Sequence, residues 1–239
     1  MGKRITQQAR GKGSLTFRVR RKAYRYRITY PSLNTKGDLK VIKLFNSPAH
    51  TTPLIKVQTN GKEKELFIIP AARDIYEGQK IYIGKRPENK NPELGDILNL
   101  KDIPQGVKVF NLESAPGKGG KFLRSAGASG IIMSKDNKKV EILIKRRRIK
   151  LNQDCRAIVG IAAGEGRLMK PLIKAGKRHH IMKALGRKWH RTSAVKVNAI
   201  DHPFGSGRGK RIKSKIAKRN SSPGQKVGHI RPKRTGKRK

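Results

Sequence analysis

Acidic residues are scarce in this sequence. Asp and Glu together number 15 against 59 Lys and Arg, so the formal net charge is +44 over 239 residues. Self-repulsion of this size works against a compact isolated chain unless a polyanion offsets it. Nucleic acid is the commonest polyanion, and an anionic membrane surface is the second candidate. The charge therefore predicts a nucleic-acid-binding protein.

Cysteine and long apolar runs are also nearly absent. The single Cys155 excludes an intrachain disulfide and a Cys-x-x-Cys zinc motif, and it suits a reducing compartment. The most apolar short run, Ala157 to Ala163, is far shorter than the roughly 20 residues of a membrane-spanning helix. The first ten residues lack the apolar stretch of a secretory signal. We therefore expect a cytoplasmic location and no membrane partner.

The few acidic residues are unevenly distributed, and this divides the chain. Residues 1–36 carry 11 Lys and Arg and no acid, and residues 37–115 carry 12 against 10 acids. Residues 116–201 carry 22 against 5, and residues 202–239 carry 14 against none. Acid-free ends cannot bury enough apolar surface to fold alone, so we expect both ends to be arms that only a partner orders.

Two tyrosines stand among the cations of the first arm. Tyr24 and Tyr26 lie between Arg21 and Arg27, and aromatics interleaved with cations favour base stacking beside phosphate pairing. The alternative is a β-strand whose tyrosines face a small core.

Between the arms, short apolar runs of strand character alternate with Gly, Pro and Asn. The first module has candidate strands at residues 39–45, 54–59, 65–69, 80–83 and 107–112. Five such strands favour a small closed or partly open barrel, of which the oligonucleotide-binding (OB) barrel is one example. A second β-rich module has candidate strands at 122–125, 131–134, 139–145 and 157–161. We expect no helix longer than about three turns and a short one at 183–189.

Glycines and a restrained histidine mark residues 198–211 as the strongest candidate site. Pro203 holds His202 toward extended geometry, while Gly205, Gly207 and Gly209 allow close backbone approach. The segment is therefore either a backbone that presses against another polymer or a flexible linker. Asp201 and His202 are the only catalytic candidates, and we expect Asp201 to hold the imidazole so that His202 organises the turn and does not catalyse.

The sequence spacing does not match a nucleotide-hydrolase loop or a metal-binding motif. Neither Gly209-Lys210 nor Gly120-Lys121 has the upstream Gly and the following Ser or Thr of a phosphate-binding nucleotide-hydrolase loop. The histidines His179, His180, His190 and His202 lack metal-motif spacing. We therefore expect no enzyme, no metal and no cofactor.

The run Arg146-Arg147-Arg148 is expected at a strand end or in a hairpin that faces RNA phosphates. The alternative is a solvated edge that discourages sheet aggregation.

Several motifs together resemble one family. The clearest are Lys170 to Gly176, Trp189 and Asn198 to Gly205, and further likenesses are Gly119 to Lys121 with Arg124 to Gly127, Cys155 to Gly160, and Ser222 to Ile230 with Arg234 to Gly236. They are similar, in the same order, to the large ribosomal subunit protein two family, called protein eight in the eukaryotic cytoplasm, and the ending is of the archaeal and eukaryotic type. The chain departs from the family at Lys145 to Arg148 and at Ser193 to Val197.

The resemblance implies an all-β fold with an OB-like barrel at 37–115, an SH3-like barrel at 116–191, a basic arm at 1–36 and a glycine-rich basic extension at 192–239. It also implies large-subunit ribosomal RNA (rRNA), neighbouring ribosomal proteins and the small subunit as partners, with no DNA partner. The C-terminal loop would approach the peptidyl transferase region. The alternative function is a non-ribosomal RNA chaperone or compaction protein.

Our predicted RNA-binding residues are cations, glycines and rings drawn from both the arms and the second module. They are Arg18, Arg20, Arg21, Arg25, Lys118, Lys121, Arg124, Arg146, Arg147, Arg148, Lys170, Lys174, Arg178, Trp189, His202, Phe204, Gly205, Gly207, Arg208, Gly209, Lys210, Arg211 and His229.

Overall fold

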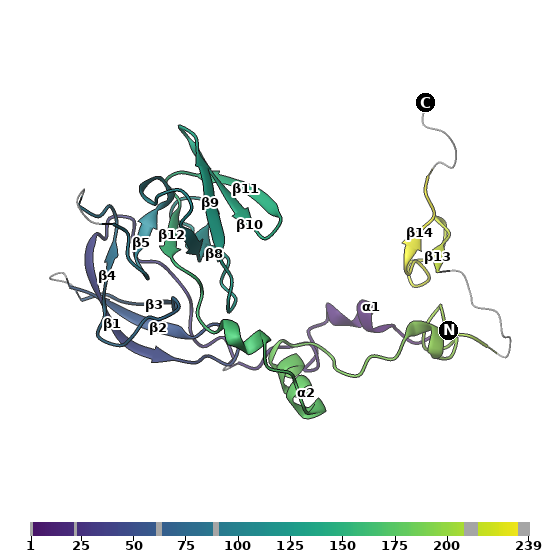
Figure 1. Cartoon of the computed structure of the whole chain (residues 1–239). Coiled ribbons are helices and arrows are strands. Elements are labelled where there is room, and N and C mark those ends of the chain that lie inside the picture. Colours follow the sequence, from purple (N-terminus) through teal and green to yellow (C-terminus); the bar gives the residue numbers. More distant parts are fainter. Residues whose placement is uncertain (1, 22, 61–63, 88–90, 208–214, 234–239) are drawn as a thin grey trace. The chain divides into compact units, whose positions relative to one another are not determined.

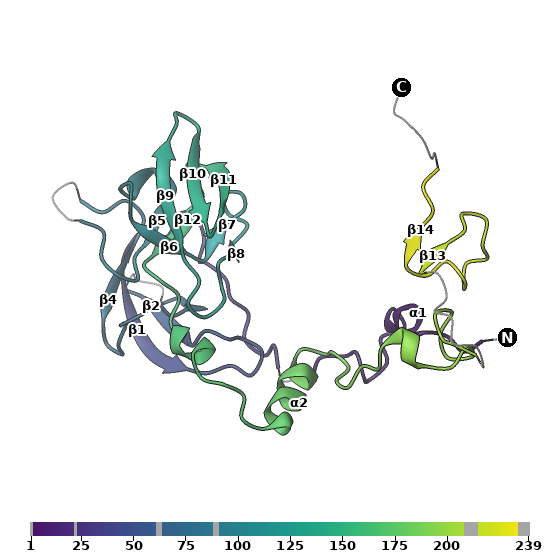
Figure 2. The same ribbon diagram turned by 45° about the vertical axis from the view of Figure 1, so that its right-hand side comes forward.

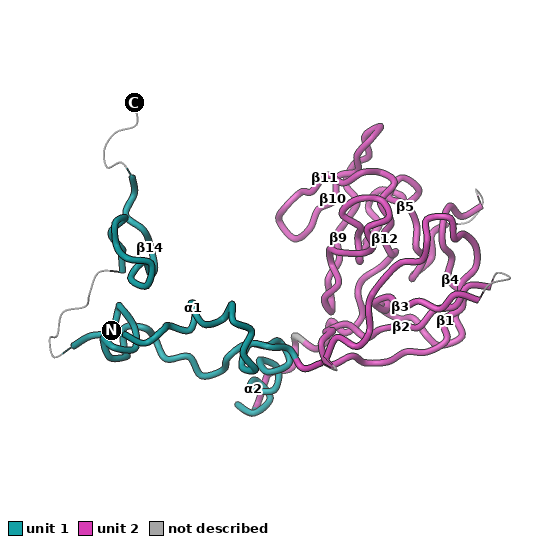
Figure 3. The backbone as a smooth tube through the Cα atoms, turned by 180° about the vertical axis from the view of Figure 1, so that it is seen from behind, with its two compact units in different colours: residues 1–19, 174–239 teal, residues 20–173 magenta. Residues whose placement is uncertain are grey.

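The computed structural model describes the chain except for residues 1, 22, 61–63, 88–90, 208–214 and 234–239 (Figure 1). The chain forms two compact units (Figure 3). Residues 20–173 make the β unit. Residues 1–19 and 174–239 together make a second unit, which we call the terminal unit.

The β unit contains one continuous sheet with the strand order β11-β10-β9-β6-β12-β5-β4-β1-β2-β3. These strands are β1 (Gly37–Phe45), β2 (Leu54–Thr59), β3 (Leu66–Pro70), β4 (Lys80–Ile83), β5 (Ile97–Asn99), β6 (Lys108–Phe110), β9 (Gly130–Lys135), β10 (Lys139–Ile144), β11 (Arg147–Asn152) and β12 (Arg156–Val159). Figure 2 shows β9, β10 and β11 grouped apart from β1, β2 and β4. A separate pair joins β7 (Leu112–Glu113) to β8 (Gly120–Phe122), and the 3-10 turns are η1 (Leu100–Asp102) and η2 (Glu165–Leu168). The predicted all-β class is confirmed.

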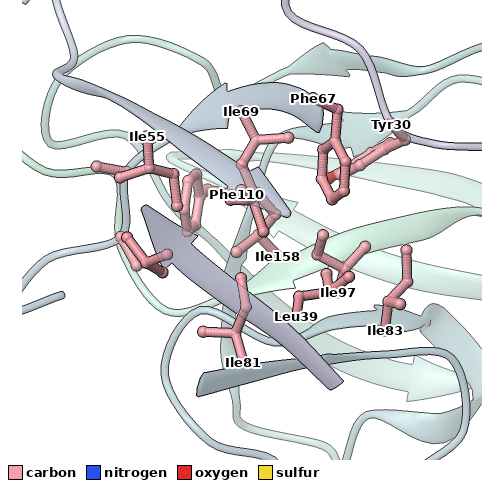
Figure 4. Packing of buried hydrophobic residues seen from close by; sticks show 14 of the residues in the cluster. Tyr30, Leu39, Ile55, Phe67, Ile69, Ile81, Ile83, Ile97, Phe110 and Ile158 are labelled. Atoms are coloured by element: carbon pink, nitrogen blue, oxygen red, sulfur yellow. The ribbon is translucent and has the colours of Figure 1, made fainter. Parts of the chain in front are cut away.

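Three central strands, β5, β6 and β12, separate two hydrophobic cores. Successive side chains of a strand point to opposite faces, so Ile158 of β12 enters the first core while Ala157 and Val159 enter the second. The first core is packed by strands β1 to β4 (Figure 4), and the second by β9 to β11. The same alternation sends Ile97 and Phe110 to the first core and Leu98 and Val109 to the second. The OB-like and SH3-like barrels therefore share these strands.

Strand pairing crosses the position at which the sequence placed a domain boundary. Both β5 and β6 precede residue 115, yet each pairs antiparallel with β12. A single residue pair, Ile83 with Ile97, joins β4 to β5. Continuous apolar runs are typical of strands buried on both faces, and such runs do not reveal which neighbouring module a strand joins.

Most predicted strands are confirmed, and β2 and β4 have the predicted bounds. The prediction at 122–125 is wrong in position, because β8 ends at Phe122 and Leu123 adopts a left-handed φ of 57°. Strand β11 was missed. Its first residues are charged and exposed, so its apolar alternation is weak, and only pairing with β10 in a hairpin defines it.

The described residues between 20 and 36 belong to the β unit and form no strand. Tyr30 is buried in the first core, and its Oη donates to the carbonyl of Asn111 at 2.7 Å. The strand alternative for Tyr24 and Tyr26 is wrong, because the described residues between 18 and 36 contain no strand. Tyr26 packs edge-on against Phe45, with 4.7 Å between ring centroids, whereas the Tyr24 side chain is exposed.

The terminal unit contains short elements: α1 (Thr6–Arg10), α2 (Ala175–Ala184), η3 (Ala194–Lys196) and the parallel pair β13 (Ile216–Ala217) with β14 (His229–Ile230). The helix predicted at 183–189 is wrong in position, because Gly186 adopts a left-handed φ of 62° just after α2 and ends the helix. In the described part of the chain, no helix is long and apolar enough to cross a membrane.

The terminal unit has almost no core. Among its described residues, the buried hydrophobic side chains are Ile5 and Ala217, and α2 buries none. Its two chain segments are held by a few polar contacts. The backbone N–H of Lys3 donates to the carbonyl of Ile200 at 2.8 Å, and the Gln8 amide donates to the carbonyl of Gly224 at 3.2 Å.

Limited proteolysis of the free protein should therefore remove the terminal unit and leave a core that begins before Tyr30 and ends near residue 173. The sequence alone placed the arms at residues 1–36 and 202–239. The reason for the shift is that so little burial cannot offset the chain entropy of ordering 1–19 and 174–239, whereas Tyr30 is fixed inside a core. Mass spectrometry of the resistant fragment gives both ends, and protection of residues 174–239 from the earliest time points would contradict this expectation.

Candidate nucleic-acid interface

The glycine-rich loop of the β unit folds over a buried carboxylate. Glu113 is fully buried and accepts hydrogen bonds from the backbone N–H groups of Gly117 at 3.4 Å and Gly119 at 3.1 Å. Both glycines have left-handed φ values near 75°, which explains the residue type. The buried Glu113 carboxylate thus fixes the loop backbone. The predicted RNA-binding residues Lys118 and Lys121 are exposed.

Arg156 neutralises this carboxylate and also binds the backbone of the segment that precedes β1. Its Nη2 donates to Glu113 Oε1 at 2.9 Å, and its backbone N–H donates to Oε2 at 2.9 Å. Its Nη1 donates to the carbonyl of Pro31 at 2.8 Å. The guanidinium lies 5.0 Å from the centroid of the Tyr30 ring, and burial raises the pKa of Tyr30 well above its usual value, so the phenol remains a donor.

The Arg124 side chain is exposed, and it also makes a hydrogen bond within the chain. Its Nη1 donates to the carbonyl of Gly120 at 3.1 Å, and its own carbonyl accepts from Thr52 Oγ1 at 3.0 Å. Burial, and then the charge of Arg124, lower the pKa of His50, whose ring meets Tyr24 edge-on at 5.6 Å. Burial and the charge of Arg124 thus favour the neutral form of the imidazole beside Tyr24.

The three-arginine run lies at the hairpin between β10 and β11, as predicted. Lys145 takes the left-handed turn with φ 55°, and Arg147 and Arg148 begin β11 opposite Ile144 and Leu143. The side chains from Lys145 to Arg148 are exposed. Arg148 has a carboxylate near it, with 3.9 Å between its Nη1 and Glu141 Oε2. The hairpin is thus an accessible cationic tip, and its contact with RNA stays a prediction.

The loop around His202 is organised differently from the prediction. Asp201 does not hold the imidazole; its carboxylate pairs with Lys3 Nζ at 3.0 Å. His202 Nδ1 instead accepts the backbone N–H of Phe204 at 3.0 Å, so this nitrogen carries no proton and Nε2–H is left as a donor. The Asp201 carboxylate, which we expected to bind the neighbouring His202, is thus paired with Lys3 near the other end of the chain.

The described part of the glycine segment is a compact turn. The N–H of Gly205 donates to the carbonyl of His202 at 2.8 Å, and a Cβ at Gly205 would collide with the carbonyl of Asn198. Phe204 is half-buried, and its ring occupies the space that a Cβ at Gly228 would need. These glycines are therefore required by close packing within the chain.

The remaining predicted contacts are divided between the two units. Trp189 is half-buried and has a partner within the chain, since the Arg178 guanidinium lies 5.6 Å from its ring centroid. The other predicted residues that the structure describes are exposed. They are Arg20, Arg21, Arg25 and Lys170 in the β unit and Arg18, Lys174, Gly207 and His229 in the terminal unit. Arg208, Gly209, Lys210 and Arg211 lie outside the described residues.

Sequence reasoning missed the residues that organise the interface from inside: Glu113, Arg156 and Tyr30. One signal was present, because Glu113 stands directly after a buried apolar run and just before the glycine-rich loop. A charged residue at that place in a strand needs a buried partner.

Comparison with known proteins agrees with the motif resemblance. A family model described as "Ribosomal Proteins L2, C-terminal domain" matches residues 93–224, a span that includes β5 and β6 together with β12, with which both of them pair. The chain is 38% identical over 248 residues to large ribosomal subunit protein uL2 of Methanocaldococcus jannaschii. It is 39% identical over 245 residues to the uL2 protein of Archaeoglobus fulgidus and 39% over 246 to that of Methanococcus maripaludis. Each alignment covers 100% of both proteins. The chain therefore belongs to the family of large ribosomal subunit protein uL2.

Proposed function

We propose that this protein is a structural constituent of the large ribosomal subunit that binds large-subunit rRNA and stabilises its tertiary fold. The observation that carries the proposal is the full-length likeness to uL2 proteins in a chain of net charge +44. Its partners are then rRNA and neighbouring ribosomal proteins within the cytoplasmic ribosome, and its role is structural and not enzymatic.

The mechanism that we propose is electrostatic. Each phosphate neutralised by Lys or Arg releases counterions, and RNA helices that repel one another can then pack together. The β unit supplies cations on a fixed backbone, at the glycine-rich loop and the β10–β11 hairpin. The terminal unit supplies a longer, nearly coreless surface that RNA would order. Shape and backbone would be recognised more than sequence.

The finer placement rests on the family resemblance. We propose that the loop around His202 approaches the peptidyl transferase region and that the protein supports association with the small subunit. A non-ribosomal RNA chaperone would share the charge but not the full-length likeness. Co-sedimentation with large subunits through a high-salt wash separates the two, because a chaperone bound only by non-specific charge is released.

Replacing Arg146, Arg147 and Arg148 together with Gln should flatten the salt dependence of binding to a large-subunit rRNA fragment. Each lost phosphate contact lowers the log-log slope by about 0.7 to 0.9, so three contacts lower it by about 2 to 3. The measurement is the dissociation constant by filter binding over a series of salt concentrations.

A matched control removes the same charge from the other barrel, by changing the exposed Lys40, Lys43 and Lys80 to Gln. We expect a smaller change of slope there, because those strands carry none of the predicted RNA contacts. If the arginine variant keeps the wild-type slope, the hairpin is only a solvated edge.

A further inference from the structure

The terminal unit holds a concavity of about 610 Å³ that both ends of the chain line. Residues 4–7 of the N-terminal segment form one part of its wall, and the C-terminal residues 188, 190–194, 197, 201 and 202 form the rest. A volume of this size is in the range of about 300 to 1,000 Å³ that small organic ligands occupy. The hollow is therefore large enough for a nucleotide.

The polar part of this wall is cationic. Arg4, Lys188 and Arg191 are exposed at the concavity. The acid in its lining is Asp201, and that carboxylate is paired with Lys3 at 3.0 Å. The cations thus face the hollow with little internal neutralisation, which favours an anionic ligand such as a phosphate group.

The other part of the wall can hold a base. Ile5 is only 6% exposed, and Ala194 and Val197 are half-buried, so an apolar surface lies inside the cationic rim. Two imidazoles, His190 and His202, also line the hollow. The Nε2–H of His202 is left as a donor because its Nδ1 accepts from Phe204. Unpaired RNA bases are typically held by such a combination of apolar or aromatic contact and a few donors.

We propose that this concavity receives a single unpaired nucleotide of RNA, with the base against Ile5, Ala194 and Val197 and the phosphate at Arg4, Lys188 and Arg191. The inference rests on the proposed function, since it assumes RNA as the partner. A duplex backbone would need only an outward cationic surface, and it would leave the apolar interior of the hollow unused.

The site depends on the N-terminal segment. Backbone and side-chain contacts of Lys3, to Ile200 and Asp201, place residues 4–7 against the C-terminal extension. Ile5 is the buried anchor of this contact. The nucleotide site therefore exists only when the two ends of the chain are docked on each other.

The test is an Ala194→Phe variant, which fills the hollow without changing the charge. Large subunits assembled with wild-type or variant protein are probed with base-specific reagents. We expect an unpaired rRNA base that is protected in wild-type particles to become about tenfold more reactive in the variant, as the loss of one base contact implies. Ala175→Phe is the matched control, because Ala175 is exposed on α2 and outside the concavity. It should leave that base protected.

A second measurement covers a variant that fails to assemble. A photoreactive side chain in place of Thr192, an exposed residue of the lining, leaves Ala194 unchanged and should crosslink to an unpaired nucleotide, whereas a crosslink to base-paired RNA or to protein would overturn the proposal. Ala194→Phe particles with unchanged base reactivity would overturn it too, and they would still contain the protein, so the proposed ribosomal role would stand. Absence of the wild-type protein from large subunits would instead defeat the proposed function itself.

Discussion

Replacing Arg156 with Met should lower the free energy of unfolding of the β unit by about 3 to 5 kcal/mol, the usual cost of leaving one charge of a buried pair without its partner. The Glu113 side chain is 0% exposed and that of Arg156 is 7% exposed, so water could not replace the lost contact. The same change removes the donor to the carbonyls of Pro31 and Ser32, so the segment that precedes β1 should become more mobile as well.

Urea unfolding of the full chain, followed by circular dichroism, measures this effect. The matched control is Lys101→Met, because Lys101 also pairs with a carboxylate at 2.9 Å, that of Asp154, but both side chains are about half exposed. A surface pair of this kind contributes at most about 1 kcal/mol. A loss no greater for Arg156→Met than for Lys101→Met would mean that the buried pair does not stabilise the unit.

Removing the charge of Glu113 as well should recover part of the free energy of unfolding that Arg156→Met loses. In the double variant with Glu113→Gln, neither side chain of this pair carries a charge. Recovery should be incomplete, since the Glu113 carboxylate also accepts from the backbone of Gly117 and Gly119 and an amide has only one acceptor oxygen for these bonds.

Truncating Phe110 to Ala should destabilise both barrels together by about 3 to 5 kcal/mol, the usual range for a buried Phe. Phe110 is fully buried in the first core, yet it lies on β6, one of the strands that the two barrels share. Leu98→Ala makes the reciprocal change, because Leu98 enters the second core from β5. We expect each variant to unfold in a single transition.

Hydrogen exchange resolves the two barrels. Protection of amides in β2, which belongs to the first barrel, and in β10, which belongs to the second, should fall by similar factors in both variants. The control Leu66→Ala removes a side chain that is 53% exposed on β3 and should cost no more than about 0.5 kcal/mol. Loosening confined to β1–β4 in Phe110→Ala would show that the barrels are independent.

The sequence by itself determined the fold class and the type of partner. Alternation along residues 54–59 and 80–83 is a local property of the chain, and β2 and β4 have those bounds. Net charge is also independent of folding, so an excess of 44 cations predicts a polyanion before any contact is known. The exposed cations of the β10–β11 hairpin could be placed because turns and charge runs are local signals as well.

Only the tertiary structure decided which charges are partners. Glu113 meets Arg156, which is 43 positions away in the sequence, because β7 adjoins β12. Lys3 pairs with the Asp201 carboxylate that local spacing had assigned to His202. Such partners depend on which segments become neighbours in space, and a buried charge accepts whichever opposite charge the fold brings within hydrogen-bond distance. Pairing of the two ends in one unit, and the sharing of β5, β6 and β12 by two cores, were likewise undetermined by the sequence, because period-two patterns specify the faces of a strand and not its neighbours.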